Sequence, residues 1–124
     1  MPGAMVLVVE DNEKNMKLFR DVLQATGYST LEASTGEQAV ELAVAQSPAL
    51  ILMDVQLPGI DGLEALARLR ADERAASIRV IALTAQAMHG DRERFLEAGF
   101  DGYLSKPVDI AELLRTVEES CASE

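Results

Sequence analysis

Five short apolar runs recur along the chain, and each is followed by a segment whose apolar residues have helical spacing. The runs predict strands at residues 5–9, 28–33, 50–54, 79–83 and 102–105. The run at 50–53 is apolar at every position and leads directly into Asp54, which is typical of a strand buried on both faces of a sheet. The run at 28–33 alternates only loosely, so we expect that strand near an edge of the sheet.

The segments between these runs predict five helices with recognisable start and stop signals. Asn12 is expected to cap the first helix and Gly27 to end it. Its inward face is expected to carry Asn15, Leu18, Phe19, Val22 and Leu23. The stretch Ser34-Thr35-Gly36-Glu37 has the pattern of a capping box that starts the second helix.

Three further helices follow the later strands. They are expected at about 61–72, from Met88 or Gly90 to Ala98, and from a cap at Asp109 to about Cys121. Strand and helix thus alternate five times, which predicts an α/β fold with a doubly wound parallel sheet, helices on both faces and right-handed crossovers. A chain of 124 residues is one domain, expected at 5–121. Residues 1–4 are interpreted as a leader or expression remnant and residues 122–124 as a C-terminal tail.

Polar side chains that suit one shared site stand where four of these strands end: Glu10 and Asp11, Asp54, Thr84, and Lys106. The carboxyl ends of parallel strands meet at one edge of a sheet, so we expect these groups in one crevice. Carboxylates held that close repel one another and need a cation, and oxygen ligands suit Mg²⁺. A carboxylate beside Mg²⁺ and a lysine is a plausible nucleophile toward a phosphoryl group.

Composition excludes several other classes of function. The formal net charge of -10 repels phosphate backbones, so we expect no nucleic-acid binding. The one cysteine, Cys121, cannot form an internal disulfide and fits a cytoplasmic protein, and its register places it at the edge of the core. The one histidine, His89, has no partner for a metal site and is expected on the surface. We expect no membrane span and find no secretion signal.

The motif set resembles that of the receiver domains of two-component response regulators, the CheY-like family, and in detail its single-domain regulators. The resemblance covers Met5 to about Ser120. It rests on Glu10-Asp11, on Asp54 followed by Pro58 and Gly62, on Thr84-Ala85, and on Lys106-Pro107. The implied fold is a flavodoxin-like sandwich with strand order 2-1-3-4-5, the order known for CheY itself.

The resemblance also implies a role for each site residue. Asp54 would accept a phosphoryl group, and Glu10, Asp11, Asp54 and the backbone carbonyl of Gln56 would hold Mg²⁺. Thr84 and Lys106 would contact the phosphoryl oxygens, and Tyr103 would move with Thr84 as a switch. The Lys106–Pro107 bond is expected to be cis. Glu10 departs from the commoner aspartate, which lengthens that arm without removing a metal ligand.

The predicted function is therefore a signalling switch in a bacterial phosphorelay, with no enzymatic activity beyond Mg²⁺-dependent self-phosphorylation and autodephosphorylation. Two alternatives remain open: a HAD-like phosphohydrolase, disfavoured because Gln56 stands where a second acid is typical, and a degenerate receiver that only binds proteins. Expected partners are a histidine kinase or phosphotransfer protein and a protein output partner, with the chain a monomer or weak dimer. Whether the chain is a stand-alone regulator or part of a longer protein also stays open.

Overall fold

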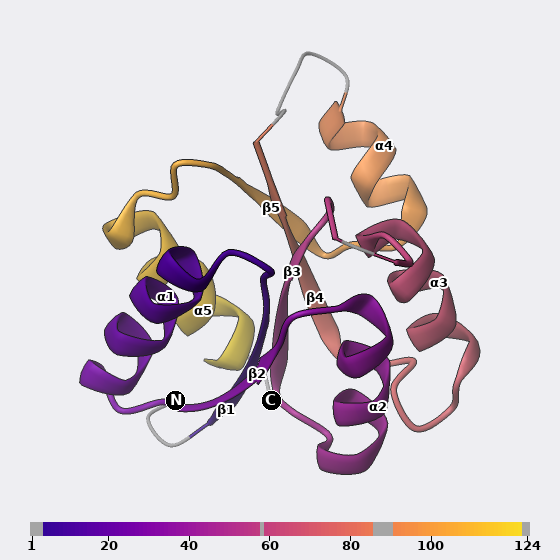
Figure 1. Ribbon diagram of the computed structural model, residues 1–124, viewed down its shortest axis with the longest axis horizontal. Helices are drawn as coiled ribbons and strands as arrows, with labels where there is room; N and C mark the ends of the chain where they lie inside the picture. Colours follow the sequence, from indigo (N-terminus) through magenta and orange to yellow (C-terminus); the bar gives the residue numbers. More distant parts are fainter. Residues whose placement is uncertain (1–3, 58, 86–90, 123–124) are drawn as a thin grey trace.

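A computed structural model describes residues 4–57, 59–85 and 91–122. It is a five-stranded parallel sheet between two layers of helices (Figure 1). The strands are β1 (Met5–Val9), β2 (Ser29–Ala33), β3 (Leu50–Asp54), β4 (Arg79–Thr84) and β5 (Gly102–Ser105). The helices are α1 (Glu13–Ala25), α2 (Gly36–Gln46), α3 (Gly62–Ala71), α4 (Asp91–Ala98) and α5 (Ile110–Ala122). The strand order β2-β1-β3-β4-β5 confirms the predicted topology and places β2 at an edge.

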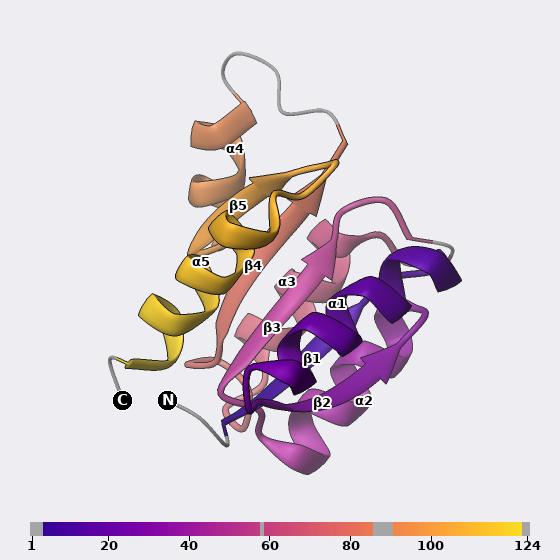
Figure 2. The same ribbon diagram turned by 90° about the vertical axis from the view of Figure 1, so that its left-hand side faces the viewer.

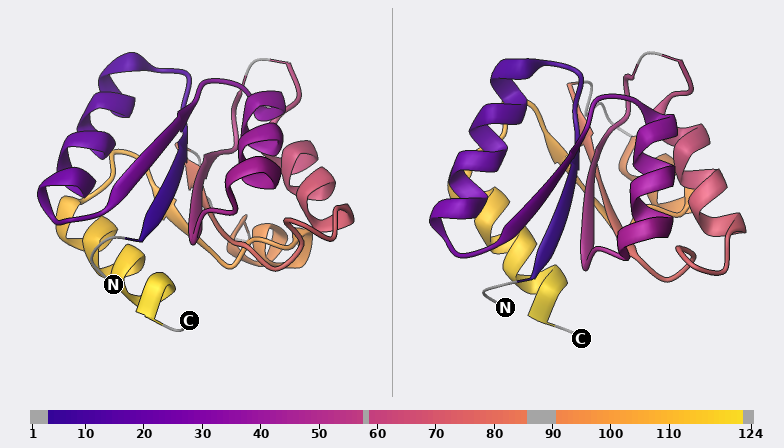
Figure 3. Two further views of the ribbon diagram at one scale, coloured as in Figure 1. Left: turned by 90° about the horizontal axis from the view of Figure 1, so that it is seen from below. Right: turned by 60° about the horizontal axis from the view of Figure 1, so that its bottom comes forward.

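The two faces of the sheet build separate cores. Figure 2 shows α1 and α5 in front of the sheet, and both views of Figure 3 show α2 and α3 on the opposite side. Alternate residues of each central strand serve opposite cores, as strand geometry requires. In β3, Leu50 and Leu52 join the core under α1 and α5, whereas Ile51 and Met53 join the core under α2, α3 and α4. The unbroken apolar run is thus explained by burial on both faces.

The first two helices have the kinds of cap that the sequence predicts, but α1 buries a different set of residues and α2 is capped by a different residue. Asn12 caps α1, since its side chain accepts hydrogen bonds from the backbone N–H of Lys14 and Asn15. The expected inward position of Leu18 is wrong. Leu18 is 44% exposed, and Met16 is buried in its place. The predicted inward positions 15, 18, 19, 22 and 23 form a stripe wider than the strip that contacts the sheet, so its outer edge, at Leu18, faces solvent.

The capping box of α2 lies one residue later than predicted. Thr35, not Ser34, is the cap, and its hydroxyl oxygen accepts from the N–H of Gln38. The side chain of Gln38, not that of Glu37, reaches back and accepts from the Ser34 N–H at 2.9 Å. Serine and threonine are both common helix caps, so finding the two side by side did not decide which of them caps α2.

Two smaller differences concern strand ends. β2 begins at Ser29 rather than at Tyr28, although Tyr28 is buried. β4 extends through Thr84. Cys121, expected at the edge of the core, is fully buried. No helix within the described residues is long and apolar enough to cross a bilayer.

Several predictions lie outside the described residues. They concern the first three residues and the last two, Pro58, the start of the fourth helix at Met88 or Gly90, and His89.

The turn between β3 and α3 ends at Gly62, where two backbone segments lie too close together for a residue with a Cβ atom. A Cβ atom on Gly62 would lie 2.5 Å from the carbonyl oxygen of Asp54 and 2.8 Å from the Cα of Val55. The Gly62 N–H also donates to the Val55 carbonyl at 2.9 Å. This contact fixes the start of α3 directly against the residue that ends β3.

Candidate functional site

The site is centred on Asp54, the last residue of β3. Its side chain is buried, although a carboxylate in such a place needs compensating partners. One oxygen, Oδ1, accepts from the backbone N–H of Gln56 at 2.9 Å. The other, Oδ2, accepts from the ammonium of Lys106 at 2.6 Å. Asp54 is thus held from its own loop and from the end of β5.

Glu10 and Asp11 follow β1, the neighbour of β3, and complete an acidic cluster. The two side chains differ in exposure: Glu10 is 2% exposed, whereas Asp11 faces solvent. Lys106 Nζ donates to both oxygens of Glu10, at 2.8 Å to Oε2 and 3.1 Å to Oε1. One ammonium therefore joins the ends of β1, β3 and β5.

Burial and these contacts shift two pKa values. Burial, together with the neighbouring carboxyl of Asp54, raises the pKa of Glu10, and this outweighs the opposing hydrogen bonds from Lys106 and Asn15. Burial alone would lower the pKa of Lys106, but its hydrogen bonds with Asp54 and Glu10 raise it overall. Lys106 therefore remains a cation, and the cluster still holds excess negative charge.

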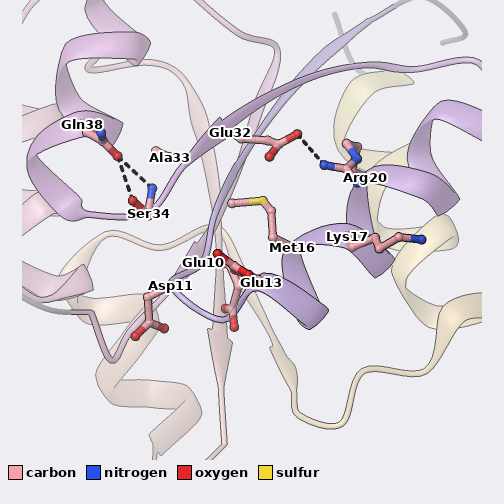
Figure 4. A pocket seen from close by; sticks show the side chains of 10 residues that line it. All are labelled: Glu10, Asp11, Glu13, Met16, Lys17, Arg20, Glu32, Ala33, Ser34 and Gln38. Carbon is pink, nitrogen blue, oxygen red and sulfur yellow. Dashed lines mark hydrogen bonds and ion pairs between the residues drawn. The ribbon is translucent and has the colours of Figure 1, made fainter.

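The donor set fits a magnesium ion. One carboxylate oxygen from each of Glu10, Asp11 and Asp54 lies within 4.8 Å of the others. Hard oxygen donors with solvent access on one side suit Mg²⁺, which retains several of its waters. The solvent access is on the side of Asp11, where a groove of about 800 Å³ runs between α1 and the end of β2. Figure 4 shows Asp11 and Glu10 in that groove, with Arg20 paired to Glu32 on its far wall.

Thr84 and Tyr103 lie on one face of the sheet at neighbouring positions. Thr84 ends β4 and is buried, and Tyr103 in β5 is paired in register with Ala82. Since Ala82 and Thr84 point to the same face, Tyr103 and Thr84 are diagonal neighbours there. The Tyr103 ring is half-buried and lies 6.3 Å from the ring of Phe95 in α4, centroid to centroid.

The sequence thus identified the residues that the structure brings together at the sheet edge, namely Glu10, Asp11, Asp54 and Lys106. Tyr103 lies outside this cluster, and the Gln56 side chain is exposed. The sequence reasoning placed Asn15 only on an inward helix face and missed its contact with the site: Asn15 Nδ2 donates to Glu10 Oε1 at 2.9 Å. The available signal was an amide three residues after the helix cap, where the side chain points back toward the preceding loop. The cis Lys106–Pro107 bond is confirmed.

Comparison with known proteins identifies close relatives. The family model for the response regulator receiver domain matches residues 6–118. The polar-differentiation response regulator DivK of Brucella ovis is 48% identical over 113 residues, which cover 91% of this chain and 92% of that protein.

Solved structures agree with the sequence matches. The receiver domain of the sensor histidine kinase PA1611 from Pseudomonas aeruginosa, with a magnesium ion in its active-site cleft, is 41% identical with a TM-score of 0.89, over 97% of this chain and 98% of that one. The structure of the Saccharomyces cerevisiae phosphotransfer protein Ypd1 with the receiver domain of Ssk1 gives 30% identity and a TM-score of 0.90, over 98% of this chain and 90% of that one.

Proposed function

The chain belongs to the response regulator receiver domain family of two-component signalling, and we propose that Asp54 is the residue on which it accepts a phosphoryl group. One observation carries this assignment. The buried carboxylate of Asp54 contacts the Lys106 ammonium at 2.6 Å and shares a cluster with the oxygens of Glu10 and Asp11. The family match favours this reading over a HAD-like phosphohydrolase, and the complete set of charged groups disfavours a degenerate receiver.

The transfer we propose is an in-line displacement. A carboxylate oxygen of Asp54 forms a bond to phosphorus while the bond from phosphorus to a histidine nitrogen, or to the leaving oxygen of a small donor, breaks. Lys106 neutralises charge on the transferred oxygens, and the Thr84 hydroxyl donates to one of them. Glu10, Asp11, Asp54 and the Gln56 carbonyl would hold Mg²⁺, which would supply further neutralisation of that charge.

Two surfaces suit the two classes of partner. The phosphodonor, a histidine kinase or phosphotransfer protein, is proposed to contact α1 beside Lys106. There Leu18, Phe19 and Val108 line a mainly apolar pocket of about 380 Å³. The output partner is proposed to bind the face formed by α4, β5 and α5.

The acidic residues of that output face limit the kind of partner that can bind there. A pocket of about 420 Å³ includes the half-buried Tyr103 together with the acidic residues Asp101, Glu112 and Glu119. A protein with a basic patch matches these acids, whereas a nucleic acid would be repelled. We further propose that the chain acts in the cytoplasm as a monomer or weak dimer, with no activity beyond its own phosphorylation and dephosphorylation.

The test of the phosphoacceptor uses acetyl phosphate and intact-mass measurement. The wild-type chain with Mg²⁺ should gain one phosphoryl group, labile to hydroxylamine, and the gain should disappear in EDTA. Asp54→Asn keeps the shape but removes the nucleophile, so it should gain none. Asp61→Asn is the matched control, because Asp61 caps α3 at the end of the same loop and asparagine caps as well as aspartate.

Undiminished phosphorylation of Asp54→Asn would overturn the assignment of Asp54. Rapid turnover of phosphomonoesters by the wild type would favour the phosphohydrolase instead. Binding to the cognate kinase and output protein, with and without beryllofluoride, tests the partner surfaces. Equal affinity in the two states would contradict the switch.

A further inference from the structure

Asn15 contacts the acidic cluster from outside the set of residues assigned to it above. Its Nδ2 donates to Glu10 Oε1 at 2.9 Å. Glu10 Oε1 also receives the longer of the two Lys106 bonds, at 3.1 Å, whereas Oε2 receives the shorter one, at 2.8 Å. The two oxygens of this buried carboxylate are therefore not equivalent: within the described residues, Oε1 accepts from both Asn15 and Lys106, whereas Oε2 has the shorter bond from Lys106.

The backbone around Asn15 is fixed by the helix start. Asn12 Oδ1 accepts from the Asn15 N–H at 3.1 Å, so Asn15 is the third residue of α1 after its cap. Side chains at that position lean toward the helix N-terminus, which is the direction of Glu10. The Asn15 amide is thus directed at Glu10 by the geometry of the cap itself.

Asparagine is not the residue that helix formation alone would favour there. Glutamate or glutamine completes a capping box at this position, and an acidic side chain interacts better with the helix dipole. Asparagine is also a poorer helix former than either. Asparagine instead provides a short side chain whose N–H donates to a carboxylate. A residue that is unfavourable for the helix at this position indicates a role at the site.

We infer that Asn15 is a positioning residue for Glu10: it holds Oε1 and so fixes the direction in which Oε2 faces the acidic cluster. The inference rests on the proposed magnesium site. A glutamate side chain has three rotatable bonds, and ordering it to present one oxygen costs conformational entropy. The hydrogen bond from Asn15 orders the Glu10 side chain before the metal binds, so metal binding itself loses less conformational entropy. Partners that orient a metal-ligating group typically change metal affinity about 10-fold to 100-fold.

The test is a double-mutant cycle on the Mg²⁺ dissociation constant of the unphosphorylated protein, measured by NMR titration. Asn15→Leu keeps the side-chain shape without the donor and should weaken Mg²⁺ binding about tenfold. Glu10→Asp shortens the arm by one methylene and takes its carboxylate away from Asn15. In that background, Asn15→Leu should change Mg²⁺ affinity less than about twofold.

Gln24→Leu is the matched control for loss of an amide from α1. Gln24 Nε2 donates to Thr30 Oγ1 at 2.8 Å at the other end of the helix, so Mg²⁺ affinity should stay at the wild-type value. Equal weakening by Asn15→Leu in both backgrounds, or no weakening in either, would overturn the inference while leaving the metal site intact. A wild-type chain that showed no response to Mg²⁺ would overturn the metal site, and the role of Asn15 with it.

Discussion

The ammonium of Lys106 lies 2.6 Å from the carboxylate of Asp54, although the two residues are 52 positions apart in the chain. The same ammonium contacts Glu10, so one cation balances two carboxylates that are almost fully buried. The Lys106 side chain is itself 19% exposed. The metal-free cluster therefore depends on Lys106 for its charge balance.

Removing that cation should destabilise the metal-free protein. Lys106→Met keeps the aliphatic stem but leaves Glu10 and Asp54 without a cation. Breaking a buried ion pair costs roughly 3–5 kcal/mol, and partial exposure reduces this here to about 2 kcal/mol. Urea unfolding in EDTA measures the loss.

The double variant Glu10→Gln with Lys106→Met is the control for this prediction. It leaves only one of the two carboxylates, so it should recover part of the lost stability, and the two changes should not add. Metal-free Lys106→Met as stable as the wild type would show that the contact contributes nothing.

The strands and their order could be predicted because two independent patterns coincide. Runs such as Leu50–Met53 are apolar at every position, and helical segments separate them. Burial on both faces explains the first pattern and crossover connections the second. The buried face of the first helix was less predictable, because Leu18 lies in the predicted stripe but is exposed, whereas Met16 lies outside that stripe and is buried. Burying a leucine or a methionine side chain contributes a similar free energy, so composition alone does not decide which of the two faces the sheet.

The site residues could be predicted because they lie at strand ends, whose positions topology alone determines. What the sequence could not provide is which side chains share partners. One lysine contacts both Glu10 and Asp54, and Asn15 donates a hydrogen bond to Glu10. Both contacts depend on side-chain directions that packing determines. The role of Arg70 was likewise invisible, because its partners are mostly backbone carbonyls, two in the segment after α3 and one in the loop before β5.

Arg70 should be a major contributor to stability at the edge of the sheet opposite the site. Its guanidinium donates to the carbonyls of Ala76 at 3.0 Å, Ile78 at 2.6 Å and Gly99 at 2.8 Å, and to Asp101 at 3.0 Å. Arg70→Met would remove this donor from the three carbonyls, whereas Asp101 Oδ2 would still accept from the Val80 N–H, and the expected cost is about 2–3 kcal/mol. Urea unfolding measures this cost, and phosphorylation of Asp54 should continue.

Arg68→Met is the matched control for Arg70. Arg68 pairs only with Glu64 among the described residues, at 2.7 Å on the exposed side of α3. Such surface pairs contribute about 0.5 kcal/mol or less. Similar losses in the two variants would contradict a special role for Arg70.

The raised pKa of Glu10 predicts a pH dependence of metal-free stability. The folded protein binds the Glu10 proton more tightly than the unfolded chain does, so protonation stabilises the fold at low pH. This stabilisation is lost as the pH rises above the ordinary value of 4.5 and through the raised pKa. Glu10→Gln has no such proton, so the free energy of unfolding of the wild type minus that of Glu10→Gln should fall over this range in EDTA.

Magnesium should reverse this trend. The metal binds only the ionised carboxylate, and at 100 times its dissociation constant it stabilises the folded state by about 2.7 kcal/mol. Wild-type stability in Mg²⁺ should therefore rise relative to Glu10→Gln as the pH increases. A difference between the two proteins that did not change with pH in EDTA would contradict the assigned shift. Lys106 does not interfere, because its pKa is raised from 10.5, above this range.

The diagonal placement of Thr84 and Tyr103 predicts that the threonine hydroxyl couples phosphorylation to the output face. Thr84→Ala should still accept phosphate on Asp54, because the nucleophile and Lys106 remain. Its phosphorylated form should leave the NMR resonances of α4, β5 and α5 close to their unphosphorylated positions. Alanine has no hydroxyl to move toward the phosphoryl oxygens, so the space beside Tyr103 is the same in both states. Thr84→Ser, which keeps the hydroxyl, should retain most of the wild-type shifts. A phosphorylated Thr84→Ala spectrum that matched the active wild type would show that the output face responds by a route that bypasses Thr84.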